Sequence, residues 1–176
     1  GNPGSKYAGT RHNIGFEVLD AFARRHGVRS TQQRFRGFWA DAQVSGTKVF
    51  LLKPQTFMNR SGQSVGEAAR FYKIPPERIV IIHDELDLPP ATLRFKRGGG
   101  HAGQNGLRSI IEMLGTKDFI RLRFGIGKSP YKGRGADYVL SPFGQDEVDA
   151  IEASIDRATG ALDDLLGDGL ETATQR

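Results

Sequence analysis

The stretch from His83 to Gly106 limits the possible folds of this chain more than any other part of the sequence. It follows an apolar run at residues 78–82 that predicts a buried strand, and it ends where a helix is predicted to begin near Asn105. In open α/β sheets, ligands bind beyond the carboxyl ends of strands, which is where Asp84 lies. The glycines at 98–100 allow a backbone to approach a ligand closely. The alternative interpretation is that this stretch is only a turn-rich loop before a capped helix, with no functional role.

Composition excludes several classes of protein. The chain has 176 residues, 38% of them hydrophobic, which is enough for one domain with a sizeable core. No apolar run approaches the roughly 20 residues of a membrane span, and no signal-peptide pattern is present. The sequence contains no cysteine, which excludes disulfides and thiolate metal sites and favours a reducing, cytoplasmic location.

The charges are unevenly distributed along the chain. Residues 94–134 carry ten Lys or Arg against two Asp or Glu, a net charge of +8. Residues 135–176 carry two Arg against ten Asp or Glu, a net charge of −8. A basic middle segment followed by an acidic tail favours a face that binds a polyanion such as nucleic acid, although ordinary surface scatter is the alternative.

Helical and strand patterns alternate along the sequence. Helices are predicted at 14–26, 61–72, 107–114 and 148–165, and strands at 35–44, 48–53, 78–83, 119–124 and 138–140. Asn13 is the predicted N-cap of the first helix. This order predicts an α/β fold in which residues 1–176 form a single domain with a twisted, mixed β-sheet flanked by helices. Because the turn at residues 1–4 follows no element, we expect that a preceding strand is absent.

Two familiar patterns in the sequence do not meet the physical requirements of the functional sites that they resemble. Ser64, between Gly62 and Gly66, matches the G-x-S-x-G nucleophile elbow of serine esterases. That elbow requires a strand that runs directly into the serine, whereas here a helix is predicted. His83 and Asp84 are metal-ligand types, but adjacent residues on a strand point to opposite faces, so no metal site is predicted.

A different set of side chains suits hydrolysis. His12 precedes a predicted helix and lies off its apolar stripe, while Asp84 lies at a strand end. A histidine held by an aspartate can activate water as a general base. Amides in turns, from Asn2, Asn59 and Asn105, can hold a substrate and stabilise an oxyanion. Beside a basic face, such groups suit cleavage of an acyl bond on a polyanionic carrier.

At these residues the sequence resembles the bacterial peptidyl-tRNA hydrolase family over nearly its whole length. The matching motifs, in order, are Gly1-Asn2-Pro3-Gly4 with Tyr7, Thr10-Arg11-His12-Asn13, Lys53-Pro54-Gln55-Thr56-Phe57-Met58-Asn59 with Ser61-Gly62, His83-Asp84-Glu85-Leu86-Asp87-Leu88-Pro89, Gly98-Gly99-Gly100-His101, Asn105-Gly106-Leu107, Arg121-Leu122-Arg123-Phe124-Gly125-Ile126-Gly127 and Tyr138-Val139-Leu140. No single motif carries the resemblance.

The resemblance implies hydrolysis of the ester that joins a peptide to tRNA, which recycles tRNA in translation and ribosome rescue. It implies no cofactor or metal, a monomer in the cytoplasm, and contacts with the acceptor end and 5′ phosphate of the tRNA. His12 would be the base and Asp84 its partner. The expected substrate-binding residues are Asn2, Tyr7, Phe57, Met58, Asn59 and Asn105, and the expected tRNA-binding residues are Lys96, Arg97, Arg121 and Arg123.

Two departures from the family bear on these expectations. Family members carry a hydrophobic strand before the first motif, and many have histidine where Gln104 stands. Glutamine cannot titrate near neutral pH, which leaves His12 as the base. A non-catalytic RNA-binding relative, similar to plant organelle splicing factors, is the alternative from another class, and the intact His12, Asp84, Asn59 and Asn105 argue against it.

Overall fold

The structure, a computed structural model of the chain, describes residues 1–130, 133–169 and 173. Its strands are β1 (Gln32–Arg34), β2 (Gly37–Val44), β3 (Thr47–Pro54), β4 (Val80–Glu85), β5 (Leu93–Arg97) and β6 (Ile120–Gly125). Its α-helices are α1 (Ile14–Arg25), α2 (Ser61–Tyr72), α3 (Asn105–Leu114), α4 (Gly135–Val139) and α5 (Val148–Asp168). Short 3-10 helices are η1 (Ser5–Tyr7), η2 (Arg11–Asn13), η3 (Met58–Arg60) and η4 (Pro76–Arg78).

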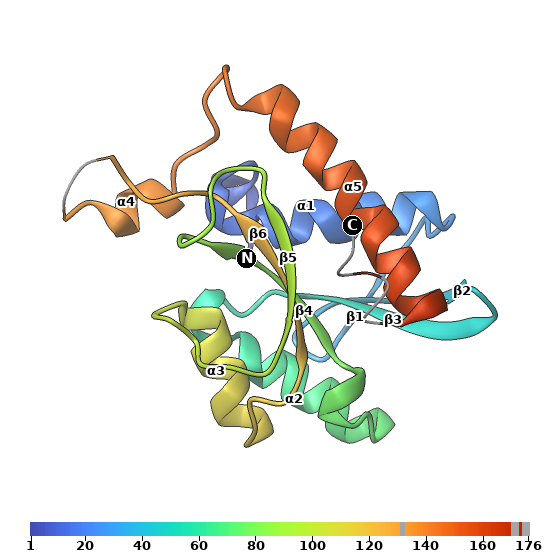
Figure 1. Cartoon of the computed structure of the whole chain (residues 1–176). Helices are drawn as coiled ribbons and strands as arrows, with labels where there is room; N and C mark the ends of the chain where they lie inside the picture. Colours follow the sequence, from blue (N-terminus) through green and yellow to red (C-terminus); the bar gives the residue numbers. More distant parts are fainter. Residues whose placement is uncertain (131–132, 170–172, 174–176) are drawn as a thin grey trace.

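The strands form two three-stranded sheets, and helices flank them, which confirms the predicted α/β class (Figure 1). The predicted mixed sheet is β4-β6-β5, in which β4 and β6 are parallel and β5 is antiparallel to β6. The hairpin of β2 and β3, with β1 beside it, forms a second and wholly antiparallel sheet. Its turn, Ser45 and Gly46, has positive φ at both residues, as the tight hairpin turn requires.

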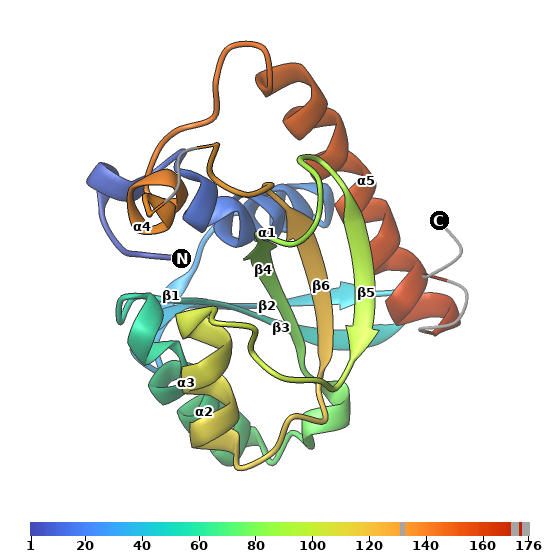
Figure 2. The same ribbon diagram turned by 60° about the vertical axis from the view of Figure 1, so that its left-hand side comes forward.

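The mixed sheet separates two pairs of helices (Figures 1 and 2). One face packs against α1 and α5 through a core that includes Val18, Leu122 and Leu162. The other face packs against α2 and α3 through a core that includes Leu107 and Ile110. The apolar periodicity of these helices produces this layering. The carboxyl ends of the parallel strands β4 and β6 lie together at one end of the sheet, next to η2 and the start of α3.

The prediction of a strand at residues 138–140 is wrong, because these residues lie in and just after α4. The backbone N–H of Tyr138 donates to the carbonyl of Arg134, and that of Leu140 donates to the carbonyl of Ala136. The Tyr138 hydroxyl also donates to the carbonyl of Ile126 at 2.6 Å. A run of three apolar or aromatic letters is too short to distinguish a strand from a helical turn.

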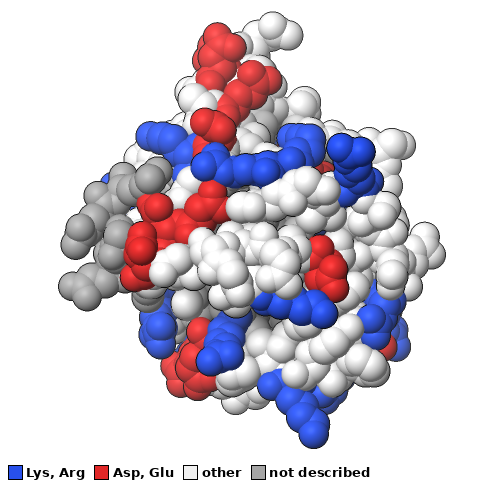
Figure 3. Space-filling model, turned by 90° about the vertical axis from the view of Figure 1, so that its right-hand side faces the viewer, with Lys and Arg blue, Asp and Glu red and all other residues white. Residues whose placement is uncertain are grey.

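The surface carries both signs of charge. Figure 3 shows a face on which Lys and Arg side chains lie beside Asp and Glu side chains, so this side of the molecule presents no uniform positive patch. In the described part of the chain, no helix is both long and apolar enough to cross a membrane.

Candidate active site

A histidine and an aspartate from distant parts of the chain meet at the carboxyl end of β4. His12 lies in η2, the turn that leads into α1, and Asp84 lies near the end of β4. His12 Nδ1 is 2.6 Å from Asp84 Oδ2. Because an ionised carboxylate can only accept, Nδ1 carries the proton, which leaves Nε2 of His12 as a proton acceptor. The structure thus brings together the two residues predicted to be catalytic.

Gln104, to which the sequence analysis assigned no role, contacts the same carboxylate. Its Nε2 donates to Asp84 Oδ1 at 2.9 Å, and its Oε1 accepts from the backbone N–H of Leu107 at 2.7 Å. Gln104 is the N-cap of α3, although glutamine is not among the residues preferred at that position. Its contact with Asp84 could not be predicted from the sequence, because it joins residues whose neighbourhood depends on the tertiary fold.

Asp84 is 2% exposed, and its protonation state follows from its neighbours. Burial alone raises the pKa of Asp84, but hydrogen bonds from His12 and Gln104 and the imidazoles of His12 and His83 outweigh it, so the pKa lies below the usual 3.8. The carboxylate is therefore ionised at neutral pH.

His83 is buried beside Asp84 but points to the opposite face of β4. Its Nδ1 lies 2.8 Å from the carbonyl oxygen of Asp84, and its Nε2 has no partner in the described part of the chain. Burial lowers the pKa of His83 below 6.5, although the nearby carboxylates of Asp84 and Glu85 oppose the shift. His83 is thus a neutral structural residue at neutral pH.

Asn2 connects three segments at the site. Its side-chain oxygen accepts from the backbone N–H of Met58 at 2.7 Å. Its backbone N–H donates to Asn13 Oδ1 at 2.7 Å, and Asn13 Nδ2 donates to the carbonyl of Asn2 at 2.8 Å. Asn13 does occupy the N-cap of α1, but its side chain makes no capping hydrogen bond, because its carboxamide is used by Asn2. The predicted N-cap position of Asn13 is thus confirmed, while its side chain connects to Asn2 instead of to the helix.

The remaining expected substrate residues differ in how far they are exposed. Phe57 is 51% exposed and has φ +65°, a conformation that is strained for a residue with a side chain and is found often at functional sites. Its ring meets that of Tyr7 edge-on, with 6.2 Å between centroids. Asn59 and Asn105 are exposed, whereas Met58 is buried and lies below the surface.

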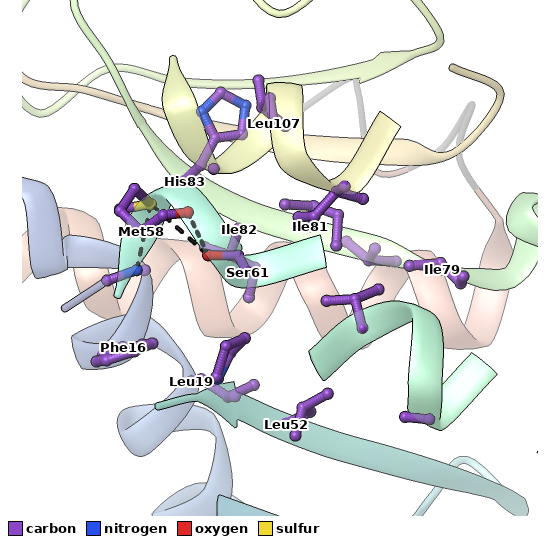
Figure 4. Close-up of a pocket in the computed structure, with 18 of the residues that line it drawn as sticks. Phe16, Leu19, Leu52, Met58, Ser61, Ile79, Ile81, Ile82, His83 and Leu107 are labelled. Atoms are coloured by element: carbon purple, nitrogen blue, oxygen red, sulfur yellow. Dashed lines mark hydrogen bonds between the residues drawn. The ribbon is translucent and has the colours of Figure 1, made fainter. Parts of the chain in front are cut away.

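A cavity of about 190 Å³ lies behind the His12 and Asp84 pair, between β3, β4, α1 and α2. Figure 4 shows Phe16 and Leu19 from α1, Leu52 from β3 and Ile82 from β4 facing it. His12 and Gln104 line one end of the cavity. The surroundings of the pair are therefore apolar on this side, and a hydrogen bond is electrostatically stronger there than in water.

Three of the expected tRNA-binding residues, Lys96, Arg121 and Arg123, lie on one face of the mixed sheet. The register pairs Lys96 with Arg121 and Arg94 with Arg123, so all four residues project from the same face. Lys96 is exposed, and Arg123, whose side chain is 25% exposed, lies 3.9 Å from Glu85. Arg97 follows Lys96 directly and projects from the opposite face.

The prediction that Arg121 binds tRNA requires correction. Arg121 is 2% exposed, and its guanidinium donates to the carbonyls of Gly99 and Gly100, with a longer contact to that of Lys117 at 3.4 Å. The family resemblance implies a tRNA contact for Arg121, but the glycine segment folds over this side chain. Arg121 therefore holds the glycine segment in place rather than facing a ligand.

The structure also removes the serine-esterase alternative. Ser64 is fully buried within α2, and its hydroxyl donates to the carbonyl of Phe35 at 2.5 Å. A Cβ atom on Gly62 would lie 2.1 Å from the carbonyl oxygen of Ser109, so this glycine permits the close packing of α2 on α3.

Within residues 1–130, 133–169 and 173, no group of three or more His, Cys, Asp or Glu side chains is placed to hold a metal ion.

Comparison with known proteins identifies the family to which the whole chain is similar. The family model described as peptidyl-tRNA hydrolase matches residues 1–176. The peptidyl-tRNA hydrolase of Halorhodospira halophila is 49% identical over 100% of this chain and 91% of its own length, and that of Azorhizobium caulinodans is 54% identical over 87% and 74%. A crystal structure of the Acinetobacter baumannii enzyme superposes with a TM-score of 0.93 at 42% identity, covering 99% of this chain and 89% of that one. The chain belongs to the peptidyl-tRNA hydrolase family.

Proposed function

We propose that this protein hydrolyses the ester bond between a peptide and the terminal ribose of tRNA, and so returns the tRNA to translation. The observation that carries the proposal is the 2.6 Å contact between His12 Nδ1 and the ionised carboxylate of Asp84. This contact leaves His12 Nε2 free to take a proton. Exposed amides next to the pair provide groups that can bind a peptide.

The reaction requires a base, water and a group that returns the proton. His12 Nε2 removes a proton from water while the hydroxide oxygen bonds to the ester carbonyl carbon, and Asp84 stabilises the imidazolium. The carbonyl electron pair moves to the oxygen, where the amide of Asn105 at the start of α3 can donate to it. The intermediate collapses, the bond to the ribose oxygen breaks, and that oxygen receives the proton from His12.

The substrate would extend in two directions from the pair. Asn59 and Asn105 can donate to and accept from a peptide backbone, and Asn2 holds the segment that carries Met58 at the site. Tyr7 and Phe57 present ring surface on which a base or an apolar side chain can stack.

Lys96 and Arg123 would bind the tRNA backbone. They project from the same face of neighbouring strands, and phosphate contacts of this kind fix register on a nucleic acid. We assign them to the acceptor end and its 5′ phosphate. We retain Arg97 as a tRNA contact, although it projects from the opposite face of the mixed sheet.

The protein would act as a cytoplasmic monomer of one domain. His12, Asp84 and Gln104 all come from one chain, so the geometry needs no second copy. The absence of cysteine from the sequence suits a reducing compartment.

The test is release of peptide from peptidyl-tRNA by the purified protein, compared with its His12→Ala variant. A general base contributes roughly 10²–10⁴-fold to a rate, so the variant should lose at least about 10²-fold in kcat and keep its tRNA affinity. A wild-type protein that binds tRNA without releasing peptide would instead support the non-catalytic RNA-binding alternative. A variant within a few-fold of wild type would remove His12 from the mechanism.

A further inference from the structure

We propose that Gln104 is a positioning residue that fixes the Asp84 carboxylate and so selects the productive tautomer of His12. The inference rests on the proposed hydrolase function, and it concerns a residue that contacts the Asp84 carboxylate. The argument begins with the orientation of the Gln104 amide, because only its –NH2 group can donate to a carboxylate.

Both ends of the Gln104 amide are assigned by partners whose roles are fixed. The backbone N–H of Leu107 is a donor and lies 2.7 Å from Oε1, so this atom is the oxygen. The ionised carboxylate of Asp84 is an acceptor and lies 2.9 Å from Nε2, so that atom is the nitrogen. Nε2 also lies 3.6 Å from Sδ of Met58. In the reversed orientation, the amide oxygen would face an oxygen of Asp84 and the –NH2 group would face the N–H of Leu107. The reversed orientation is therefore excluded.

The orientation of the Asp84 carboxylate follows from this contact. Within the described residues, the hydrogen bonds of its side chain come from His12 at Oδ2 and Gln104 at Oδ1. A carboxylate otherwise rotates about its bond to Cβ. With Oδ1 held by α3, Oδ2 is fixed toward His12 Nδ1, which keeps the proton on Nδ1 and the lone pair on Nε2.

The surrounding chain is built to allow this contact. A Cβ atom on Gly106 would lie 2.5 Å from Sδ of Met58 and 2.9 Å from Oε1 of Gln104, so glycine at this position leaves room for both side chains. Gln104 thereby ties Asp84 at the end of β4 to the first turn of α3. The other titratable neighbours of the carboxylate are His12, His83 and the amino group of Gly1, and none of them contacts Oδ1.

The capping role and the positioning role can be separated by substitution. Gln104→Ser retains an N-cap hydroxyl but is too short to reach Asp84, whereas Gln104→Met keeps the length and loses both hydrogen bonds. Gln104→His keeps a donor that can reach the carboxylate, but it titrates near neutral pH. All three are compared with wild type in steady-state hydrolysis of peptidyl-tRNA and in the ¹H and ¹⁵N resonances of the His12 ring.

If Gln104 positions Asp84, kcat should fall about 10-fold or more in both Gln104→Ser and Gln104→Met, as expected for a lost hydrogen bond to a charged group, with KM within about 2-fold of wild type. The Nδ1 proton resonance of His12 should shift in both variants. Gln104→His should retain kcat at high pH and show an additional ionisation in its pH profile.

Wild-type kcat in Gln104→Ser would overturn the proposal, because it would leave helix capping as the only role. An unshifted His12 resonance in Gln104→Ser would overturn it as well. The ring resonances do not depend on turnover, so they test the inference even if the protein proves inactive on peptidyl-tRNA, which would contradict the proposed function alone.

Discussion

At the scale of single residues, the buried carboxylate of Asp84 determines which nitrogen of His12 carries a proton. Asp84→Asn keeps the shape of the side chain, but its –NH2 group can donate to Nδ1 and so favours the tautomer whose Nε2 is protonated. We expect kcat to fall by roughly 10²-fold or more, with KM little changed. Kinetics on peptidyl-tRNA across the pH range measure this, and an unchanged kcat would make Asp84 a purely structural residue.

His83 gives the protein a pH-dependent stability. Its folded-state pKa is lowered by burial, so below pH 6.5 the unfolded chain binds a proton that the folded chain does not. Stability is therefore full above pH 6.5 and decreases as the pH falls toward the folded-state pKa, by at most about 1.4 kcal/mol per pH unit.

The measurement is urea unfolding at pH 7.5 and 5.5 for wild type and His83→Gln. The variant should lose less free energy of unfolding over this interval than wild type does. The pKa of Asp84 is lowered from 3.8, so its own contribution changes only below this window. Equal losses in the two proteins would show that His83 is protonated in the folded state.

The sequence was informative about which residues matter and less so about what they touch. His12 and Asp84 could be found because a polar side chain off an apolar stripe or at a strand end has few structural reasons to be there. Gln104 received no role and Arg121 the wrong one, because each makes a contact that is set by tertiary packing. An arginine on an alternating strand reads as exposed, and nothing local shows that a glycine segment covers it.

At the scale of elements, the distance between α1 and β4 determines whether His12 and Asp84 can meet. A Cβ atom on Gly15 would lie 2.4 Å from the carbonyl oxygen of Ile82, which is backbone and cannot move independently. Gly15→Ala should therefore displace α1, lower kcat, and destabilise the fold by roughly 1–3 kcal/mol.

Gly135→Ala is the matched control, because a Cβ atom there meets nothing within 4 Å and the backbone needs no positive φ. Its thermal unfolding and its kcat should equal those of wild type. A Gly15→Ala protein that behaves like this control would mean that α1 and β4 tolerate a wider separation.

Most elements followed from periodicity, and the exceptions have a physical cause. The long amphipathic patterns of α1, α2, α3 and α5 predicted helices within a few residues of their observed ends. The segment around Tyr138 has too few apolar residues to show a helical or strand periodicity, and it forms α4 rather than a strand. The division of the strands into two sheets also lay beyond local pattern, since it depends on which edges pair.

At the scale of the whole molecule, Lys96 and Arg123 should act on binding rather than chemistry. Each phosphate that a protein neutralises adds roughly 0.7–0.9 to the slope of log affinity against log salt. Lys96→Ala and Arg123→Ala should each raise KM on full-length tRNA and reduce that slope by about one contact. Arg29→Ala, a change at an exposed residue between α1 and β1 and outside the mixed sheet, controls for net charge.

A double cycle identifies the contact with the 5′ phosphate. KM is measured for wild type and each variant, on tRNA with and without that phosphate. The variant that has lost the contact should show no further loss when the phosphate is removed. Strictly additive losses for both residues would mean that neither binds the 5′ phosphate. Lys96 and Arg123 would then act only through non-specific electrostatic attraction of the tRNA.

The proposed catalytic pair, His12 and Asp84, joins residues 72 positions apart in the chain, and this separation affects how fast the site can form. Hairpins and helices form quickly because they join neighbouring residues. Closing a long loop is slow, because its entropy cost comes before the contact that it makes can stabilise the chain. A chain with its helices and hairpin formed therefore still lacks an active site. Enzymatic activity regained on refolding reports the completion of the last long-range docking steps, which the recovery of secondary structure alone does not.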